Sequence, residues 1–281
     1  MALVPFPSAH PAPPDPDDPR IELTDADDLD QDELDGAGAR MSFLEHLDEL
    51  RNRLIHSVVA VFVGVGLTFF FHDPIYRFVF EPTRRVLPDG SKLVYTQPGE
   101  AFSLHIQIAL IAGVIVAAPY IMLQVWKFIA PGLYSREKKM AIPFVLLSTL
   151  GFLGGALTNH YVMFPFMMKF FGSFNSADLM FLPSLDAVFS LYTKFLIAMG
   201  LIFQMPTIVM FLAKMRMVTA RFLLRNIKYA VLITFIVSAV ITPTADPGTQ
   251  TLFAMPMIAL YILSIGIAWL VAPKAESPEG D

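Results

Sequence analysis

The sequence predicts an all-α polytopic membrane protein with six transmembrane helices, and two observations carry this prediction. Hydrophobic residues make up 55% of the 281 residues, and the mean hydropathy is +0.57, which is too apolar for a soluble domain of this length. The apolar residues are also grouped into runs of about 20 residues, the length that crosses a bilayer. Because lipid offers the backbone no hydrogen-bond partners, we expect these runs to be helices.

The charged residues are segregated along the chain. Residues 1–40 contain eleven acidic residues against two basic ones, Arg20 and Arg40. We expect this segment to be a disordered acidic tail, because its Pro and Asp clusters cannot bury enough apolar surface to offset ordering. No signal peptide is expected there, since a basic stretch followed by an apolar one is absent. The membrane domain is then expected over 41–272, and a second disordered tail over 273–281.

An amphipathic helix is predicted at the start of the membrane domain. Ser42 and Glu45 have the spacing of a capping box, in which each side chain binds the backbone N–H of the other residue. Apolar residues then recur at helical spacing, at positions 43, 47, 50 and 54. The chain becomes apolar directly after Leu54 and stays apolar to Phe71, so this helix is expected to run into the first span.

The ends of the apolar runs define the remaining elements. The six spans are expected at about 54–71, 101–125, 140–162, 187–213, 229–241 and 251–271. The third span contains Gly151-x-x-x-Gly155, a stripe of small residues that favours close helix packing. The fifth span has only 13 uncharged residues. At about 1.5 Å per residue it reaches roughly 20 Å, which is short of the ~30 Å hydrocarbon core.

Two connections between spans have patterns of their own. In the segment 73–100, apolar positions at Ile75, Phe78, Val79 and Val86 predict a short amphipathic helix, and 92–96 a short extended piece. The segment 164–186, which contains Pro165, is interpreted as an apolar surface connection.

Lysine and arginine residues predict the orientation. If the N-terminus is cytoplasmic, thirteen basic residues of the membrane domain and its tails lie on that side and five on the other. The positive-inside rule therefore favours cytoplasmic N- and C-termini, and we expect a multi-pass protein of the inner (cytoplasmic) cell membrane.

Four motifs occur in order along the chain. They are HLDELRNRL at 46–54, AAPYIMLQVWKFIAPGLYSREKK at 117–139, FQMP at 203–206 and TPTADPGTQT at 242–251. Together with six spans and a cytoplasmic N-terminus, they resemble the TatC family, the receptor subunits of the twin-arginine protein translocase. The resemblance covers about 42–270.

The resemblance implies a signal-peptide site on the cytoplasmic side. Glu49 and Glu137 match the two family glutamates that receive the paired arginines of a signal peptide, and carboxylates suit guanidinium groups because the pairing can be bidentate. Without the resemblance, Glu137 would be interpreted as a solvated loop charge. Arg51 and Arg53 match family basic residues that brace the acidic groups, although contact with anionic lipid is an equal alternative. Phe128 and Pro131 are expected to shape the loop.

Two further positions are candidates for function. Gln204 lies at bilayer depth, where polar side chains are expensive, and many family members have Glu at this position. It is expected to bind the helix of a partner protein, and a helix–helix hydrogen bond inside this chain is an equal alternative. Asp246 and Pro243 belong to the turn before the last span. A structural turn residue is the first interpretation of Asp246, and the resemblance makes it a functional candidate.

The function implied by the resemblance is binding and assembly. The chain is expected to bind twin-arginine signal peptides of folded precursors and to nucleate a complex with TatA/TatB-like single-span proteins and further copies of itself. The alternative is a small-solute secondary transporter, against which no internal repeat is visible. An intramembrane hydrolase is not favoured, because the six histidines are scattered, no acid–base or metal motif is present, and cysteine is absent. We therefore expect no enzyme activity, cofactor, metal site or nucleic-acid partner.

Overall fold

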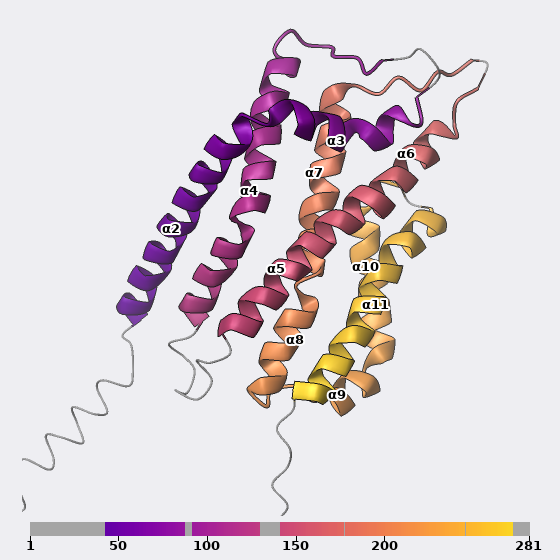
Figure 1. Cartoon of the computed structure of the whole chain (residues 1–281). Coiled ribbons are helices and arrows are strands. Elements are labelled where there is room, and N and C mark those ends of the chain that lie inside the picture. Colours follow the sequence, from indigo (N-terminus) through magenta and orange to yellow (C-terminus); the bar gives the residue numbers. More distant parts are fainter. Residues whose placement is uncertain (1–42, 88–91, 130–140, 177, 245, 272–281) are drawn as a thin grey trace, which may run out of the picture. The chain divides into compact units, whose positions relative to one another are not determined.

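The computed structural model describes residues 43–87, 92–129, 141–176, 178–244 and 246–271. These residues are helical apart from short connections and an isolated bridge between Val94 and Ser184, which confirms the predicted all-α class. The chain divides into one unit that ends at Glu49 and a second that starts at Leu50. The second unit contains nearly all of the described residues, and the helix arrangement below refers to it (Figure 1).

The helices follow one another in a simple order. Their bounds are α2 Phe43–Phe69, α3 His72–Arg84, α4 Glu100–Ile129, α5 Ala141–Thr158, the π-helix η3 Asn159–Met163, α6 Phe164–Gly172, α7 Leu185–Ile202, α8 Met205–Lys214, α9 Ala220–Arg225, α10 Ile227–Ile241 and α11 Pro247–Val271. The predicted amphipathic helix and first span are the single helix α2, and the predicted short helix after the first span is α3.

The described helices make this a multi-pass membrane protein. Five helical segments are long and apolar enough to cross a bilayer, and these are Glu45–Phe69, Glu100–Ile129, Ile142–Gly172, Leu185–Lys214 and Pro247–Val271. The predicted fifth span is the shorter apolar helix α10. Its 15 residues give a length of about 22 Å, so the prediction that this segment is unusually short is confirmed.

The prediction for the end of the third span is wrong. Instead of ending at 162, the helical path continues through η3 and α6 to Gly172. Pro165 has no N–H to donate to the carbonyl of the preceding turn, and the wider π-helical turn just before it accommodates this loss without ending the helix. The predicted surface position of α6 is also wrong, because Phe164, Met167 and Met168 are buried.

The fourth span is two helices rather than one. α7 ends at Ile202 and α8 starts at Met205, with Pro206 in the first turn of α8. The predicted glycine stripe packs against this broken helix. A Cβ atom on Gly151 would lie 2.7 Å from the Phe203 carbonyl oxygen, and one on Gly155 would lie 2.5 Å from that of Met199. Only glycine permits the α5 and α7 backbones to lie this close.

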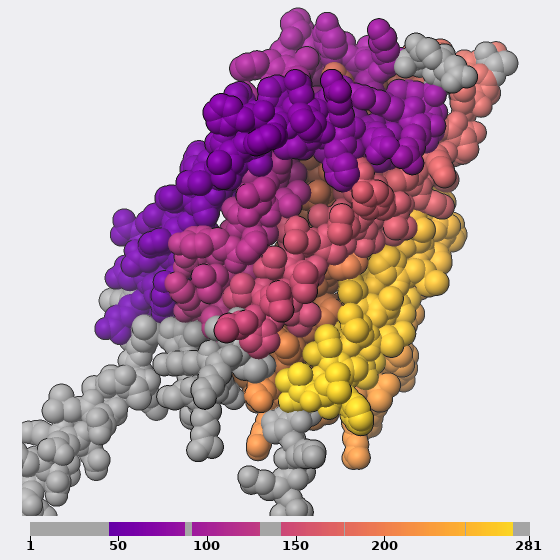
Figure 2. Space-filling view, in the orientation of Figure 1, coloured from indigo at the N-terminus to yellow at the C-terminus, as the bar shows by residue number. Residues whose placement is uncertain are grey.

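The buried core lies mainly where α3 packs on the long helices. α3 turns aside from α2 and contacts α4 and α6, and in the space-filling view its atoms lie directly against the α6 segment (Figure 2). Val79 and Phe80 of α3 are buried with Phe164 and Met168 of α6 and with Phe195 of α7. The short helix is therefore attached to the spans by an apolar face, of which the sequence predicted Val79 but not Phe80, whereas the predicted Phe78 is 43% exposed.

The ends of the helices collect into two sets (Figure 1). The end of α4, the start of α5, the α8–α9 junction and the end of α11 lie together at the lower end in the view. α3 and the end of α6 lie at the upper end, called here the α3 end. The predicted extended piece also lies at the α3 end, where the Leu185 N–H donates to the Val94 carbonyl at 2.9 Å.

Candidate functional site

The residues predicted to receive a signal peptide are only partly within the described chain. Glu49 and Arg53 are half-buried and Arg51 is exposed, all in the first turns of α2. Glu49 and Arg53 are four residues apart, which places them on the same face of the helix. Phe128 is half-buried in the last turn of α4. Pro131 and Glu137 lie outside the described residues, so the convergence of the two glutamates stays a prediction.

An apolar groove lies between α4 and α5. It has a volume of about 390 Å³ and is lined by Pro119, Leu123, Ile142, Val145, Leu146 and Thr149. Ile142 is 79% exposed and Leu146 58% exposed, so the groove can accept an apolar segment from outside the chain. It lies on the two helices that flank the connection 130–140, which carries Glu137 in the sequence.

Gln204 is positioned by the break between α7 and α8. Its Nε2 donates to the Ser148 carbonyl of α5 at 3.1 Å and, at 3.4 Å, to the Gly200 carbonyl of α7. Of the two alternatives that the sequence left open, the helix–helix hydrogen bond inside the chain is therefore present. The side chain is only half-buried, so this bond leaves room for a partner.

Other uncharged polar side chains occur on α5 and α8. The hydroxyls of Ser148, Thr149 and Thr207 are buried and have no hydrogen-bond partner among the described residues. Buried polar groups normally find a partner, so these three hydroxyls have unused hydrogen-bonding capacity. In the sequence these residues are visible as interruptions of apolar runs. Serine and threonine are common in membrane helices, so the interruptions alone did not mark a functional site.

Asp246 caps the last helix. Its Oδ2 accepts from the Thr249 backbone N–H at 2.8 Å, and its Oδ1 accepts from the Thr249 hydroxyl. These two bonds, the hydroxyl first, hold the pKa of the Asp246 carboxyl below its ordinary value. The interpretation of Asp246 as a structural turn residue is therefore confirmed, since this is the geometry of a helix N-cap. Pro243 is exposed in the same turn.

Glu100, at the α3 end, is a second carboxylate that binds backbone N–H groups, and the sequence did not predict this role. Glu100 opens α4, and its Oε2 accepts from the Thr96 backbone N–H at 2.8 Å while its Oε1 accepts from the Asp186 N–H at 2.8 Å. This side chain thereby ties the extended piece, α4 and the start of α7 together. An acid in the first turn of a helix is a recognisable capping signal, but its partner lies 86 residues away.

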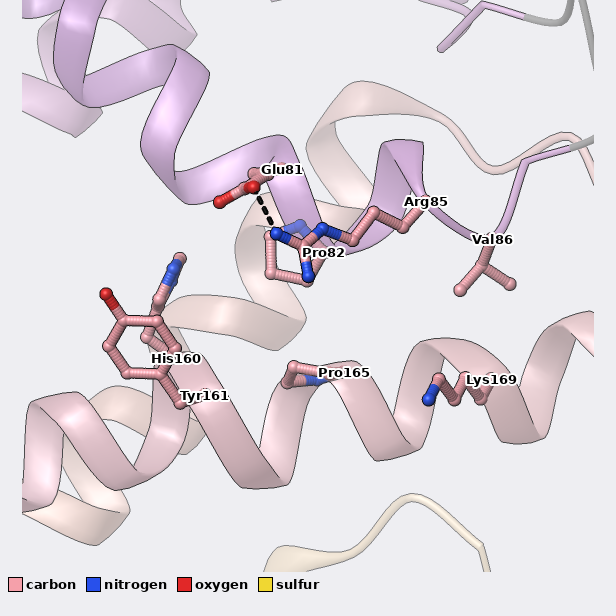
Figure 3. A pocket seen from close by; sticks show the side chains of 8 residues that line it. All are labelled: Glu81, Pro82, Arg85, Val86, His160, Tyr161, Pro165 and Lys169. Atoms are coloured by element: carbon pink, nitrogen blue, oxygen red, sulfur yellow. Dashed lines mark hydrogen bonds and ion pairs between the residues drawn. The ribbon is translucent and has the colours of Figure 1, made fainter.

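A polar pocket also lies at the α3 end, between α3 and the η3–α6 segment (Figure 3). It has a volume of about 230 Å³ and is lined by Glu81, Pro82, Arg85, Val86, His160, Tyr161, Pro165 and Lys169. Glu81 and Arg85, which are four residues apart, form an ion pair on the α3 side of its rim (Figure 3). None of the predicted site residues lines this pocket.

Known proteins are similar to this chain over the region that contains the predicted site residues. Residues 45–256 match the family described as Sec-independent protein translocase protein (TatC). A Sec-independent protein translocase protein TatC of Koribacter versatilis (strain Ellin345) is 41% identical over 88% of this chain and 90% of its own length. One from Desulforapulum autotrophicum is 36% identical over 84% of this chain and 87% of its own length.

Solved structures agree in fold as well as in sequence. A crystal structure of the twin arginine translocase receptor TatC is 36% identical and has a TM-score of 0.67, covering 81% of this chain and 99% of that one. A second crystal structure of this receptor, in DDM, has a TM-score of 0.68 and covers 80% of this chain. Every predicted site residue lies inside the matched segment 45–256.

Proposed function

This chain belongs to the TatC family, and from that premise we propose that it is the receptor subunit of a twin-arginine protein translocase. It binds the signal peptides of folded precursor proteins and nucleates assembly of the translocation complex. The observation that carries this proposal is the match over 45–256, which includes all four sequence motifs in order. The family assignment also argues against the alternative of a small-solute secondary transporter.

Recognition of the arginine pair falls to Glu49 and Glu137. A carboxylate can bind a guanidinium through two parallel charged hydrogen bonds, which lysine cannot reproduce. Arg51 and Arg53 keep the acidic groups in place, and Phe128 and Pro131 shape the loop that carries Glu137. No bond is made or broken in this process, so the protein acts as a binding subunit and not as an enzyme.

The apolar part of the signal peptide occupies the groove between α4 and α5. Ile142 lines this groove and follows Glu137 by five residues, so a peptide with its arginines at Glu137 has an apolar surface within reach. The lining is apolar except for the Thr149 hydroxyl. Because the groove lies on two membrane-spanning helices, an apolar segment is held there by van der Waals packing and not by removal from water.

Assembly uses Gln204. Single-span TatA/TatB-like proteins and further copies of this chain are the proposed partners, and nucleic acid is not one. Gln204 keeps its bond to Ser148 and offers its remaining hydrogen-bonding capacity to a partner helix. The protein lies in the inner (cytoplasmic) cell membrane with both termini in the cytoplasm, and its acidic 1–40 segment and short 273–281 segment are tails outside the six-helix domain.

A binding experiment tests the recognition step. The purified full chain is titrated with a fluorescent signal peptide that has Arg-Arg or Lys-Lys, and Glu49→Gln and Glu137→Gln are compared with Glu45→Gln, an exposed acidic residue one turn earlier. Each lost charged hydrogen bond is worth about 1.5–3 kcal/mol, less the screening by salt. We expect Kd to rise up to about 100-fold in the two variants and to stay unchanged in Glu45→Gln. Equal binding by wild type and the double variant would contradict the proposal.

A crosslinking experiment tests the groove separately. A photoreactive amino acid is placed at Leu146 in the groove or at Ile262 on α11, which are similarly exposed at 58% and 55%. We expect an Arg-Arg precursor to crosslink at Leu146 and not at Ile262. Crosslinking of equal strength at both positions would mean that the groove is not the binding surface, whatever the arginine recognition shows.

A further inference from the structure

We propose that His72, Asp73 and His105 form a binding site for a divalent transition-metal ion, Zn²⁺ in the first instance, at the α3 end of the molecule. A ring nitrogen of each histidine and a carboxylate oxygen of Asp73 all lie within 4.8 Å of one another. His72 and Asp73 open α3, whereas His105 comes from the second turn of α4. The two histidines are 33 residues apart in the sequence, which is why the histidines looked scattered.

The hydrogen bonds of the two rings prepare them for a metal. His72 Nδ1 lies 2.7 Å from the Phe69 carbonyl oxygen, and His105 Nδ1 lies 2.6 Å from that of Ala101. A carbonyl only accepts hydrogen bonds, so each neutral ring carries its proton on Nδ1. The Nε2 lone pair of each ring is then free for a metal, and a backbone carbonyl on the opposite nitrogen is the usual outer partner of a metal-binding histidine.

One ligand-to-ligand distance is already close to that of a metal site, and the others are no longer than 4.8 Å. Zn²⁺ binds nitrogen and oxygen at about 2.0–2.2 Å, so neighbouring ligand atoms in a tetrahedron are about 3.3–3.6 Å apart. His72 Nε2 and Asp73 Oδ1 are already 3.6 Å apart. The Asp73 side chain is 71% exposed and can adjust, while the His72 and His105 rings are held edge to face with their centroids 5.1 Å apart. Water completes the fourth position.

The charges and the ligand types select the class of ion. Asp73 pairs with no lysine or arginine in the described part of the chain, and His72 can neutralise it only when protonated. Two imidazoles and one carboxylate suit Zn²⁺, Ni²⁺ or Cu²⁺, whereas Mg²⁺ and Ca²⁺ prefer oxygen ligands alone. A bound ion would connect the α2–α3 corner to α4, which lie side by side in Figure 1.

The competing interpretation is an aromatic cluster with no ligand. His105 stacks on Tyr76, and Tyr76 contacts Phe80, so the rings also contribute packing. The Asp73 carboxylate has an ordinary reason to be there, since it lies in the first turn of α3 and suits the helix dipole, but neither that effect nor ring packing depends on metal ions. A metal titration therefore separates the two.

The test is a Zn²⁺ titration of the purified full chain, without a histidine tag, by competition with a zinc-sensitive dye. The variants are His105→Gln and Asp73→Asn, and the control is His56→Gln. His56 is an exposed histidine of α2 whose Nδ1 has the same kind of bond, 2.6 Å from the Asn52 carbonyl oxygen. We expect one saturable site in wild type, at least about a tenfold loss of affinity in each variant, and no change in the control.

Copper supplies a second readout. Cu²⁺ bound to wild type should give the electron spin-echo modulation of two imidazole ligands, and Cu²⁺ bound to His105→Gln that of one. Asp73→Asn replaces an exposed carboxylate with an amide of the same shape and is expected to fold even if His105→Gln does not. Equal Zn²⁺ affinity of wild type and Asp73→Asn, or no saturable site in wild type, would overturn the proposal.

Discussion

The contact between Gly155 and α7 makes a sharp prediction about stability. In Gly155→Ala the added Cβ would lie 2.5 Å from the Met199 carbonyl oxygen, 2.8 Å from its carbon and 3.0 Å from the Gly200 Cα. All three atoms are backbone, so no side chain can rotate away. An ordinary contact begins at 3.4 Å, so α5 and α7 must separate by about 0.9 Å, and overpacking of this kind costs about 1–3 kcal/mol.

The matched control is Gly66→Ala on α2, where nothing lies within 4 Å of the added Cβ. Both substitutions gain about 0.5–1 kcal/mol from replacing a helical glycine, so the difference between them isolates the clash. For a domain of this size 1 kcal/mol corresponds to about 2–4 °C. We expect Gly155→Ala to melt about 2–12 °C below Gly66→Ala in detergent, followed by tryptophan fluorescence. If the two variants melt together, the close approach of α5 and α7 is not a constraint on this fold.

Two more predictions follow from the polar residues. Gln204→Leu removes the bond to the Ser148 carbonyl and should lower stability by about 0.5–1.5 kcal/mol; an unchanged melting temperature would mean that this bond contributes nothing. Asp246→Asn removes a carboxylate whose pKa is lowered by the Thr249 hydroxyl and N–H, so the stabilisation is present above the ordinary aspartate pKa of 3.8 and is lost as the pH falls through the lower folded value. The melting difference between wild type and Asp246→Asn should therefore be full at pH 7 and shrink below about pH 4, whereas a difference that is independent of pH would refute the capping role.

Local patterns were enough to predict most of the helices. The apolar periodicity after residue 72 predicts α3, and the stripe at Gly151 and Gly155 predicts a close helix contact, because both depend on residues a few positions apart on one helix face. The short uncharged run at 229–241 likewise predicts a short α10. Each of these features follows from the helical repeat and the thickness of a bilayer.

The continuation of the third span depended on tertiary structure. Pro165 is a strong local signal for an end, but burial of Phe164, Met167 and Met168 against α3 and α7 keeps the chain helical through a π-turn. Packing of apolar surface outweighed the lost backbone bond, since each fully buried side chain of this size contributes about 1.5–3 kcal/mol. A sequence does not state which distant surface will cover a segment, so this outcome could not be predicted.

The polar pairings were also decided by the fold alone. Gln204 binds a carbonyl 56 residues away, and Glu100 binds an N–H 86 residues away. His72 and His105 lie side by side only because α3 turns back across the start of α4. The sequence by itself determined which residues are polar within an apolar chain and where most of the helices lie. Their partners are set by the packing of helices far apart in the chain, because a hydrogen bond or a metal site requires atoms to meet within a few ångströms, and only the tertiary structure brings them there.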